Sequence, residues 1–275
     1  SVVTPFVVEP GEDVEFDWAV QHNGAKEKTS YCFRMTEASG TLFELYNFYP
    51  TMRTAGYTPT LNQWRFYDDE NNITPILPLA AENTAPADVD FDNVIKLRTT
   101  VQESTGGEGT DIKFKLQFSE SSDFSTNVYD VVSSSTCALT ATTTSNTWCY
   151  ADAAGVDNAQ IDSSVLSDAD ACTGGSGTGC GIHHEGISTT TATYDQPSYA
   201  ITEYEFALKH AGARANAVYY FRLYDLTNAT TVPASTTNPS LVTAGAALTF
   251  SVGGLGAGTV TEGITTDVAT TPTAI

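Results

Sequence analysis

Carboxylates are the side chains in this sequence with the clearest capacity for chemistry. The chain has 33 Asp and Glu residues against 12 Lys and Arg, and its formal net charge is -21. An acidic surface concentrates divalent cations, and Ca²⁺ takes about six to eight oxygen ligands. Three acidic stretches could supply such ligands: 68–72, 88–92 and 152–170. None matches the EF-hand loop, and solvated turns are the alternative interpretation for each.

The third stretch is the best candidate for a calcium site, because it lies in a long loop that a cation would help to order. Its ligands would be five aspartates and one asparagine: Asp152, Asp157, Asn158, Asp162, Asp168 and Asp170. Ca²⁺ is the only cofactor that the sequence suggests.

No catalytic signature is present, and we expect a protein that is not an enzyme. His183, His184 and Glu185 stand near Cys180, but no further residue has zinc-ligand spacing. The sequence has no Gly-x-Ser-x-Gly, no phosphate-binding glycine loop before a helix and no His-Glu-x-x-His. No segment is basic enough to follow a phosphate backbone, which argues against nucleic acid as a partner.

Two aromatic residues could bind a ligand. Trp148 and Tyr150 flank Cys149, and their rings could stack on a surface glycan. The alternative is that both rings pack in the core beside a disulfide.

The cysteines indicate an oxidising, extracellular location. Four of them fall in one loop-rich region, and the local pairing, Cys137 with Cys149 and Cys172 with Cys180, is our first expectation among those that the count allows. Cys32 stands alone on an expected strand and would be a small buried residue. No apolar run reaches the length of about eighteen residues that a membrane span needs, so we expect no span.

The element that must position these residues occurs twice. Asp13–Gly56 matches Thr202–Gly245 at a spacing of about 190 residues. The matching blocks are Glu15-Phe16 with Glu205-Phe206, His22-Asn-Gly-Ala25 with His210-Ala-Gly-Ala213, Tyr31-Cys-Phe-Arg-Met35 with Tyr219-Tyr-Phe-Arg-Leu223, and Thr54-Ala-Gly56 with Thr243-Ala-Gly245. Such self-similarity indicates a repeated module. In each copy apolar residues alternate with polar ones, as in Val14–Val20, which predicts strands with one buried face.

The rest of the chain is organised around the second copy. We predict a partial module at 1–62, a complete β-sandwich at 63–252 with a Cys-rich insertion at 133–197, and an extended tail at 253–275. The clearest predicted strand alternates Ile112, Phe114, Leu116 and Phe118 with polar residues. A helix is predicted at 163–171, because Asp162 and the two serines after it could cap its first turn.

Several blocks resemble the tandem β-sandwich modules of large Ser/Thr-rich bacterial surface proteins: the repeated blocks, Trp64-Arg-Phe-Tyr-Asp68, Pro78-Leu-Ala-Ala-Glu-Asn83, Ile95-Lys-Leu-Arg98 and Lys113-Phe-Lys-Leu-Gln117. The resemblance implies an all-β protein of immunoglobulin-like or fibronectin-like sandwich modules, with a structural or adhesive role and no catalytic residues. The insertion stapled by disulfides departs from a plain sandwich.

The expected function is that of an extracellular structural subunit that assembles head to tail, so that its partner is another copy of itself. The incomplete first copy would accept a strand from a neighbour. The strand would come from the tail or from the lead, with assembly residues Val260, Ile264, Val268, Val2, Val3 and Phe6. The alternative is a cell-surface adhesin that binds a glycan through the insertion. Asn72 and Asn228 begin glycosylation sequons, which a secreted surface would tolerate.

Overall fold

The chain folds into strands. A computed structural model describes residues 9–23, 25–42, 47–70, 74–137, 144–245, 247–252 and 255–261. Within these ranges the only helical elements are two 3₁₀ turns, η1 (Ser134–Thr136) and η2 (Thr144–Asn146). The predicted all-β class is therefore confirmed.

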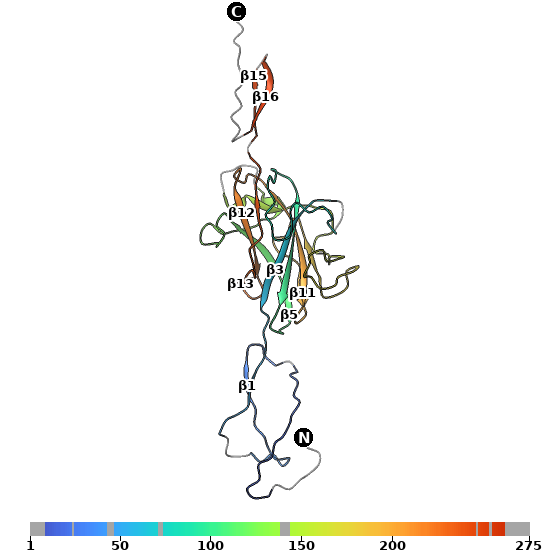
Figure 1. Ribbon diagram of the computed structural model, residues 1–275, viewed down its shortest axis with the longest axis vertical. Helices are drawn as coiled ribbons and strands as arrows, with labels where there is room; N and C mark the ends of the chain where they lie inside the picture. The colour runs from blue at the N-terminus through green and yellow to red at the C-terminus, as the bar shows by residue number, and fades with distance from the viewer. Residues whose placement is uncertain are drawn as a thin grey trace, which may run out of the picture.

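Two five-stranded sheets form the main body of the molecule (Figure 1). In the first sheet the order is β3-β4-β11-β8, and β9 also pairs with β11; in the second it is β13-β12-β6-β7, and β14 also pairs with β12. The first sheet contains β3 (Pro59–Asp68), β4 (Ile95–Glu103), β8 (Trp148–Tyr150), β9 (Cys180–His184) and β11 (Ile201–His210). The second contains β6 (Phe114–Ser119), β7 (Tyr129–Asp130), β12 (Val218–Asp225), β13 (Thr230–Thr231) and β14 (Ser240–Val242).

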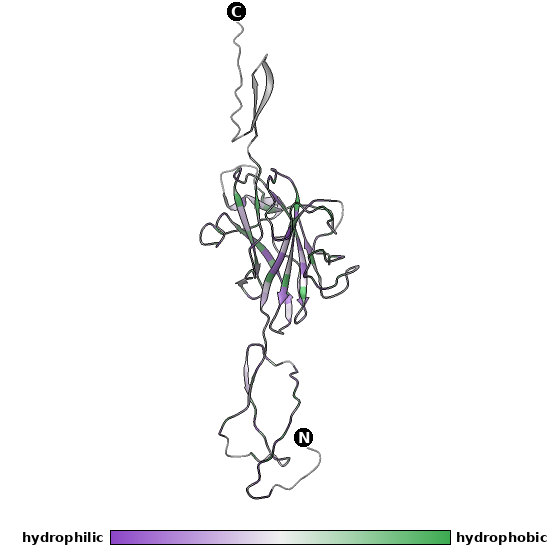
Figure 2. Ribbon diagram, viewed as in Figure 1, coloured by the Kyte–Doolittle hydropathy of each residue, from purple (hydrophilic) through white to green (hydrophobic). Residues whose placement is uncertain are grey.

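The core lies between the two sheets, as in a β-sandwich. Phe114, Leu116 and Phe118 alternate along β6 and are all buried, because successive side chains of a strand point to opposite faces. Phe66 on β3 meets Phe221 on β12 with ring centroids 6.1 Å apart, so one apolar cluster joins both sheets. Figure 2 shows hydrophilic and hydrophobic residues interleaved along the sandwich strands.

The insertion at 133–197 is part of the sandwich, although the sequence suggested a long loop. It supplies β8 and β9, which cover the far edge of β11, and β10 (Tyr194–Gln196), which pairs with β5 (Gly109–Ile112). Both predicted disulfides are present, Cys137 with Cys149 and Cys172 with Cys180.

The helix predicted at 163–171 is wrong. The backbone N–H groups of Val165 and Leu166 donate to the Glu203 carboxylate at 2.9 Å each, and that of Asp170 donates to the Ile201 carbonyl at 3.0 Å. These donors are therefore bonded to β11 instead of to a helical turn. Helix propensity is a weak preference that such tertiary contacts override.

The first copy of the repeat contains two short strands, β1 (Ser30–Cys32) and β2 (Thr51–Arg53). The strand predicted at Val14–Val20 is wrong, since residues 9–23 are in no strand. In the second copy the equivalent β11 is held between β4 on one side and β8 and β9 on the other. Among the described residues, no strand pairs with 9–23 on either side. Cys32, predicted to be buried, is exposed.

The strand register of the first copy repeats that of the second. Tyr31 lies opposite Met52 in the β1–β2 pair, and Tyr219 lies opposite Leu241 in the β12–β14 pair. These positions correspond in the sequence repeat. The bridge between Thr36 and Leu42 likewise corresponds to a pair between β12 and β13.

The hydrogen bonds around one threonine recur in both copies. The Thr54 hydroxyl donates to the Lys26 carbonyl at 2.6 Å, and the Thr243 hydroxyl donates to the Arg214 carbonyl at the same distance. Each hydroxyl also accepts a backbone N–H, from Thr29 at 3.1 Å and from Ala217 at 3.0 Å. The two copies predicted from the sequence therefore share this hydrogen-bond pattern as well as their strand register.

A hairpin follows the second copy. β15 (Ala247–Val252) and β16 (Leu255–Thr261) pair antiparallel, with Leu248 opposite Val260. Of the expected assembly residues, five lie outside the described residues: Val2, Val3, Phe6, Ile264 and Val268. Asn72 also lies outside them. None of the described residues belongs to a helix long and apolar enough to span a membrane.

Candidate functional site: a buried ionic layer beneath the insertion

Two neighbouring strands of the first sheet bury charged residues on their outer face. On β11, Tyr204, Phe206 and Leu208 belong to the core, so Glu203 and Glu205 point the other way. On β4, Lys96 and Arg98 alternate with core residues in the same manner: Ile95, Leu97 and Val101. All four charged side chains are 0% exposed. A second interface, lined by charges, therefore lies between the sheet and the insertion.

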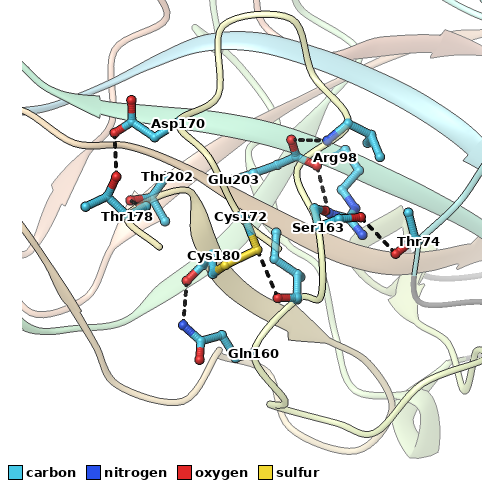
Figure 3. Close-up of a disulfide and its surroundings, with 12 residues drawn as sticks. Thr74, Arg98, Gln160, Ser163, Asp170, Cys172, Thr178, Cys180, Thr202 and Glu203 are labelled. Carbon is cyan, nitrogen blue, oxygen red and sulfur yellow. Dashed lines mark hydrogen bonds and ion pairs between the residues drawn. A yellow bond between two sulfur atoms is a disulfide. The ribbon is translucent and has the colours of Figure 1, made fainter. Parts of the chain in front are cut away.

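Arg98 lies at the centre of this layer. Its Nη1 contacts Oε1 of Glu203 at 2.7 Å, and its Nε donates to Oε2 of Glu205. Nη1 also donates to the Ser163 carbonyl at 3.2 Å. Figure 3 shows Arg98, Glu203 and Ser163 close together beside the Cys172–Cys180 disulfide. Since Glu203 also accepts the two insertion N–H groups described above, this ion pair fastens residues 163–166 onto the sheet.

The pKa values of these groups follow from burial and pairing. Burial works against the charged guanidinium, but Glu205 and Glu203 outweigh it and raise the pKa of Arg98. Burial also works against ionised Glu205, yet Arg98 and His183 lower its pKa below the usual value. For Glu203 burial dominates over Arg98 and the backbone donors, so its pKa is raised. Arg98 therefore favours the ionised form of both carboxylates.

His183 extends the layer from β9. Its Nδ1 lies 2.6 Å from Oε1 of Glu205, and its Nε2 lies 3.3 Å from Oε2 of Glu185. The same Glu185 oxygen accepts the Ala153 N–H at 2.7 Å. Burial disfavours the imidazolium, but the bond to Glu205 and the charges of Glu205 and Glu185 raise the pKa of His183. His183 thus links β9 to β11 through Glu205, and to the loop at Ala153 through Glu185.

His184 behaves in the opposite way. Its ring packs edge-on against Tyr150 with centroids 4.4 Å apart. Burial lowers the pKa of His184 to about 4, and this outweighs Asp157, whose carboxylate lies 3.2 Å from Nδ1. The pKa values of two adjacent histidines are therefore shifted in opposite directions.

This difference predicts a pH-dependent effect of His183→Gln. A raised pKa means that the folded state binds the proton more tightly than the unfolded chain does. The stabilisation is fully present below the ordinary pKa of 6.5 and is lost as pH rises through the folded-state pKa. We expect His183→Gln to lower the free energy of unfolding most below pH 6.5.

Urea unfolding of both proteins over a pH series measures this difference. His210 is present in both proteins, so its titration largely cancels in the comparison, whereas the pKa of His184 depends in part on the charge of His183. A loss that grew as pH rose above neutrality would contradict the assigned role of His183.

The structure does not gather the six predicted calcium ligands. Asp157 accepts the Glu185 N–H, Asn158 accepts the Ala192 N–H, Asp168 contacts the Thr100 hydroxyl, and Asp170 accepts the Ile201 N–H. Asp152 and Asp162 are exposed. Among the described residues no group of three or more His, Cys, Asp or Glu side chains could hold a metal ion. Asp157 and Asn158 instead satisfy backbone N–H groups of the insertion, and Asp168 and Asp170 satisfy groups of β4 and β11.

Trp148 and Tyr150 are core residues, which corrects their prediction as glycan-stacking residues. Both are 0% exposed. The Trp148 ring meets Phe221 at 5.0 Å between centroids, and the Tyr150 hydroxyl accepts the Leu116 N–H at 2.9 Å. Neither ring can reach a ligand on the surface, so the alternative of core packing holds.

Sequence reasoning missed the ionic layer. Its signal was the presence of Glu203 and Glu205 at alternate positions of β11, with Lys96 and Arg98 at alternate positions of β4. Such a pattern normally marks a solvated face. Because the insertion covers these groups completely, they hold the fold together and offer no access to a substrate. Comparison with protein-family models, curated proteins and solved structures finds no match to this chain.

Proposed function

We propose that this protein is an extracellular structural subunit that assembles head to tail by β-strand addition. The observation that carries the proposal is the register of the first copy, which reproduces the β12–β14 pair of the sandwich without the neighbouring strands. The two disulfides support an oxidising, extracellular location.

Exposure of equivalent residues shows what the first copy lacks. Phe33 is 39% exposed, whereas its counterpart Phe221 is 0% exposed. Met52 is 52% exposed, whereas its counterpart Leu241 is 0% exposed. An apolar surface of this kind, built on short strands, is only marginally stable by itself. A neighbouring molecule that covered it would bury the side chains that the second copy already buries.

The hairpin β15–β16 is the proposed donor. β15 begins just after Gly245, as β3 begins just after Gly56, so the hairpin follows the second copy where a sheet strand follows the first. In the described part of the chain it pairs only within itself, which leaves both outer edges open for strand addition. The first copy and the hairpin extend from opposite ends of the sandwich (Figure 1). A contact between unlike surfaces of this kind does not close and extends into a filament or layer.

Removing the hairpin tests the proposal. A chain that ends at Gly245 keeps every strand of both sandwich sheets, so we expect its thermal unfolding to match that of the full chain. Light scattering and negative-stain microscopy should show extended assemblies for the full chain and single molecules for the shortened one. Single molecules in both samples, at concentrations well above micromolar, would rule out head-to-tail assembly.

A further inference from the structure

We infer that a pocket between the first copy and the sandwich binds a tetrahedral oxyanion, the phosphate or sulfate group of a free ion or of a surface polymer. This site goes beyond the proposed function and does not depend on assembly. The pocket has a volume of about 410 Å³ and lies where the chain passes from the first copy into β3 (Figure 1). Its lining comes from both parts of the molecule and includes Lys28, Arg53, Thr54, Gly56, Thr58 and Thr105.

Two basic residues, Lys28 and Arg53, supply the positive charge of the pocket, and both are exposed. No carboxylate in the described part of the chain forms an ion pair with either of them. Other basic residues do have such partners: Lys96, Arg98, Lys115, Lys209 and Arg214. In a protein with a formal net charge of -21, two cations that line one pocket without a carboxylate partner form a local site for an anion.

The contacts of these two side chains leave hydrogen-bond donors for a ligand. Nζ of Lys28 donates to the Tyr57 carbonyl at 3.3 Å, and Nε of Arg53 donates to the Lys28 carbonyl at 3.3 Å. An ammonium has three N–H donors and a guanidinium has five. Neither side chain makes a further hydrogen bond within the described residues. The terminal nitrogens of Arg53 can therefore bond two oxygens of a phosphate or sulfate group, and Lys28 adds a point charge.

The threonine hydroxyls of the pocket are already bonded to the protein. The Thr54 hydroxyl donates to the Lys26 carbonyl at 2.6 Å, and the Thr105 hydroxyl lies 2.7 Å from the Gly56 carbonyl. Recognition therefore depends on the two cations. This is the chemistry of a site that selects by charge and oxygen geometry and accepts phosphate as well as sulfate.

The second copy shows that the fold does not require these two cations. By the repeat and the strand register, Asn216 occupies the position of Lys28, and Val242 occupies that of Arg53. The backbone is the same in both copies, with φ of 51° at Lys28 and 52° at Asn216. The N–H of each donates to the alanine carbonyl just before the equivalent glycine, at 3.4 Å and 3.3 Å respectively.

Lysine is a costly residue at this position. A positive φ suits asparagine better than lysine. The Lys28 side chain also lies across Gly56, where a Cβ would clash with its Cγ and Cε, whereas a Cβ on Gly245 would lie 3.4 Å from the Asn216 side chain. Residues held in such conformations cluster at ligand sites, where function offsets the strain. An anion bound by Lys28 and Arg53 accounts for a lysine where the second copy has asparagine.

Exchanging residues between the copies tests the site. Lys28→Asn with Arg53→Val gives the first copy the residues of the second, on a backbone that the second copy already adopts. The matched control is Lys113→Asn with Arg34→Val, which removes the same two charges from exposed residues that do not line the pocket. Isothermal titration calorimetry at low ionic strength measures binding of inorganic phosphate, inorganic sulfate and dextran sulfate, and thermal unfolding checks that both variants are folded.

We expect the full chain and the control variant to bind with similar affinity, and the pocket variant to bind at least tenfold more weakly. Binding of the inorganic ions would identify a free anion as the ligand, and binding of dextran sulfate alone would identify an anionic group on a polymer. Equal weakening by both variants would indicate attraction by general surface charge and would overturn the inference. The absence of binding of all three probes to the full chain would overturn it as well.

Discussion

Replacing Arg98 with Met is expected to lower the free energy of unfolding by about 3–5 kcal/mol, a large part of the roughly 5–15 kcal/mol that holds a domain folded. The substitution leaves the carboxylates of Glu203 and Glu205 buried without their cation. It also removes the guanidinium that bonds the Ser163 carbonyl. Urea unfolding followed by tryptophan fluorescence measures the effect, because Trp64 and Trp148 are buried in the adjacent core.

An exposed ion pair provides the matched control. The side chains of Arg214 and Glu120 meet at 2.7 Å but are 71% and 44% exposed, so Arg214→Met should cost no more than about 1 kcal/mol. Adding Glu203→Gln and Glu205→Gln to Arg98→Met should recover part of the loss, since the buried negative charges disappear. If Arg98→Met and Arg214→Met unfolded at the same urea concentration, the ionic layer would have no role in stability.

Phe221→Ala and Phe33→Ala should differ strongly although the two residues occupy equivalent positions of the repeat. Phe221 is 0% exposed and packs against Phe66 and Trp148, so its truncation should cost about 3–5 kcal/mol. Phe33 is 39% exposed, and its truncation should cost less than about 1 kcal/mol in the monomer. Thermal and urea unfolding of dilute protein measure both changes.

The same two substitutions distinguish an effect on the stability of the monomer from an effect on its assembly. Phe33→Ala should leave the sandwich folded and weaken head-to-tail association, because Phe33 belongs to the surface that a neighbour would cover. The sedimentation coefficient of concentrated protein provides that measurement. Equal destabilisation of the dilute monomer by both substitutions would mean that Phe33 is already buried within the monomer. The first copy would then have no apolar surface for a neighbour to cover, which would contradict head-to-tail assembly.

Local patterns predicted much of the fold. The alternation in 112–118 predicted β6, and the repeat blocks that begin at Tyr31 and Tyr219 lie on β1 and β12, which pair with β2 and β14 in the same register. The clustering of four cysteines predicted both disulfides, because short loops favour local pairing. In these cases the signal lay in residues close together in the sequence or in a direct comparison of two segments.

The remaining features depended on contacts between distant segments. Glu203 and Glu205 read as a solvated face, and only the insertion, which lies in an earlier part of the chain, makes them buried. The failed helix at 163–171 has the same cause, since Glu203 takes the N–H groups of Val165 and Leu166. Val14–Val20 has a strand pattern but no partner strand in the described residues. A periodicity shows which face could be covered, but the pattern does not identify what covers it.

The directions in which the chain enters and leaves the sandwich determine how a filament would bear tension. The chain enters the sandwich through β3 and leaves it after β14, and the first copy and the hairpin β15–β16 lie at opposite ends of the sandwich (Figure 1). A pull along the strands would shear β3 against β4, whose paired residues run from Pro59 opposite Glu103 to Asp68 opposite Ile95. Shear loads such perpendicular hydrogen bonds together. β14 pairs with β12 through three residues only, so mechanical failure would begin at the C-terminal junction.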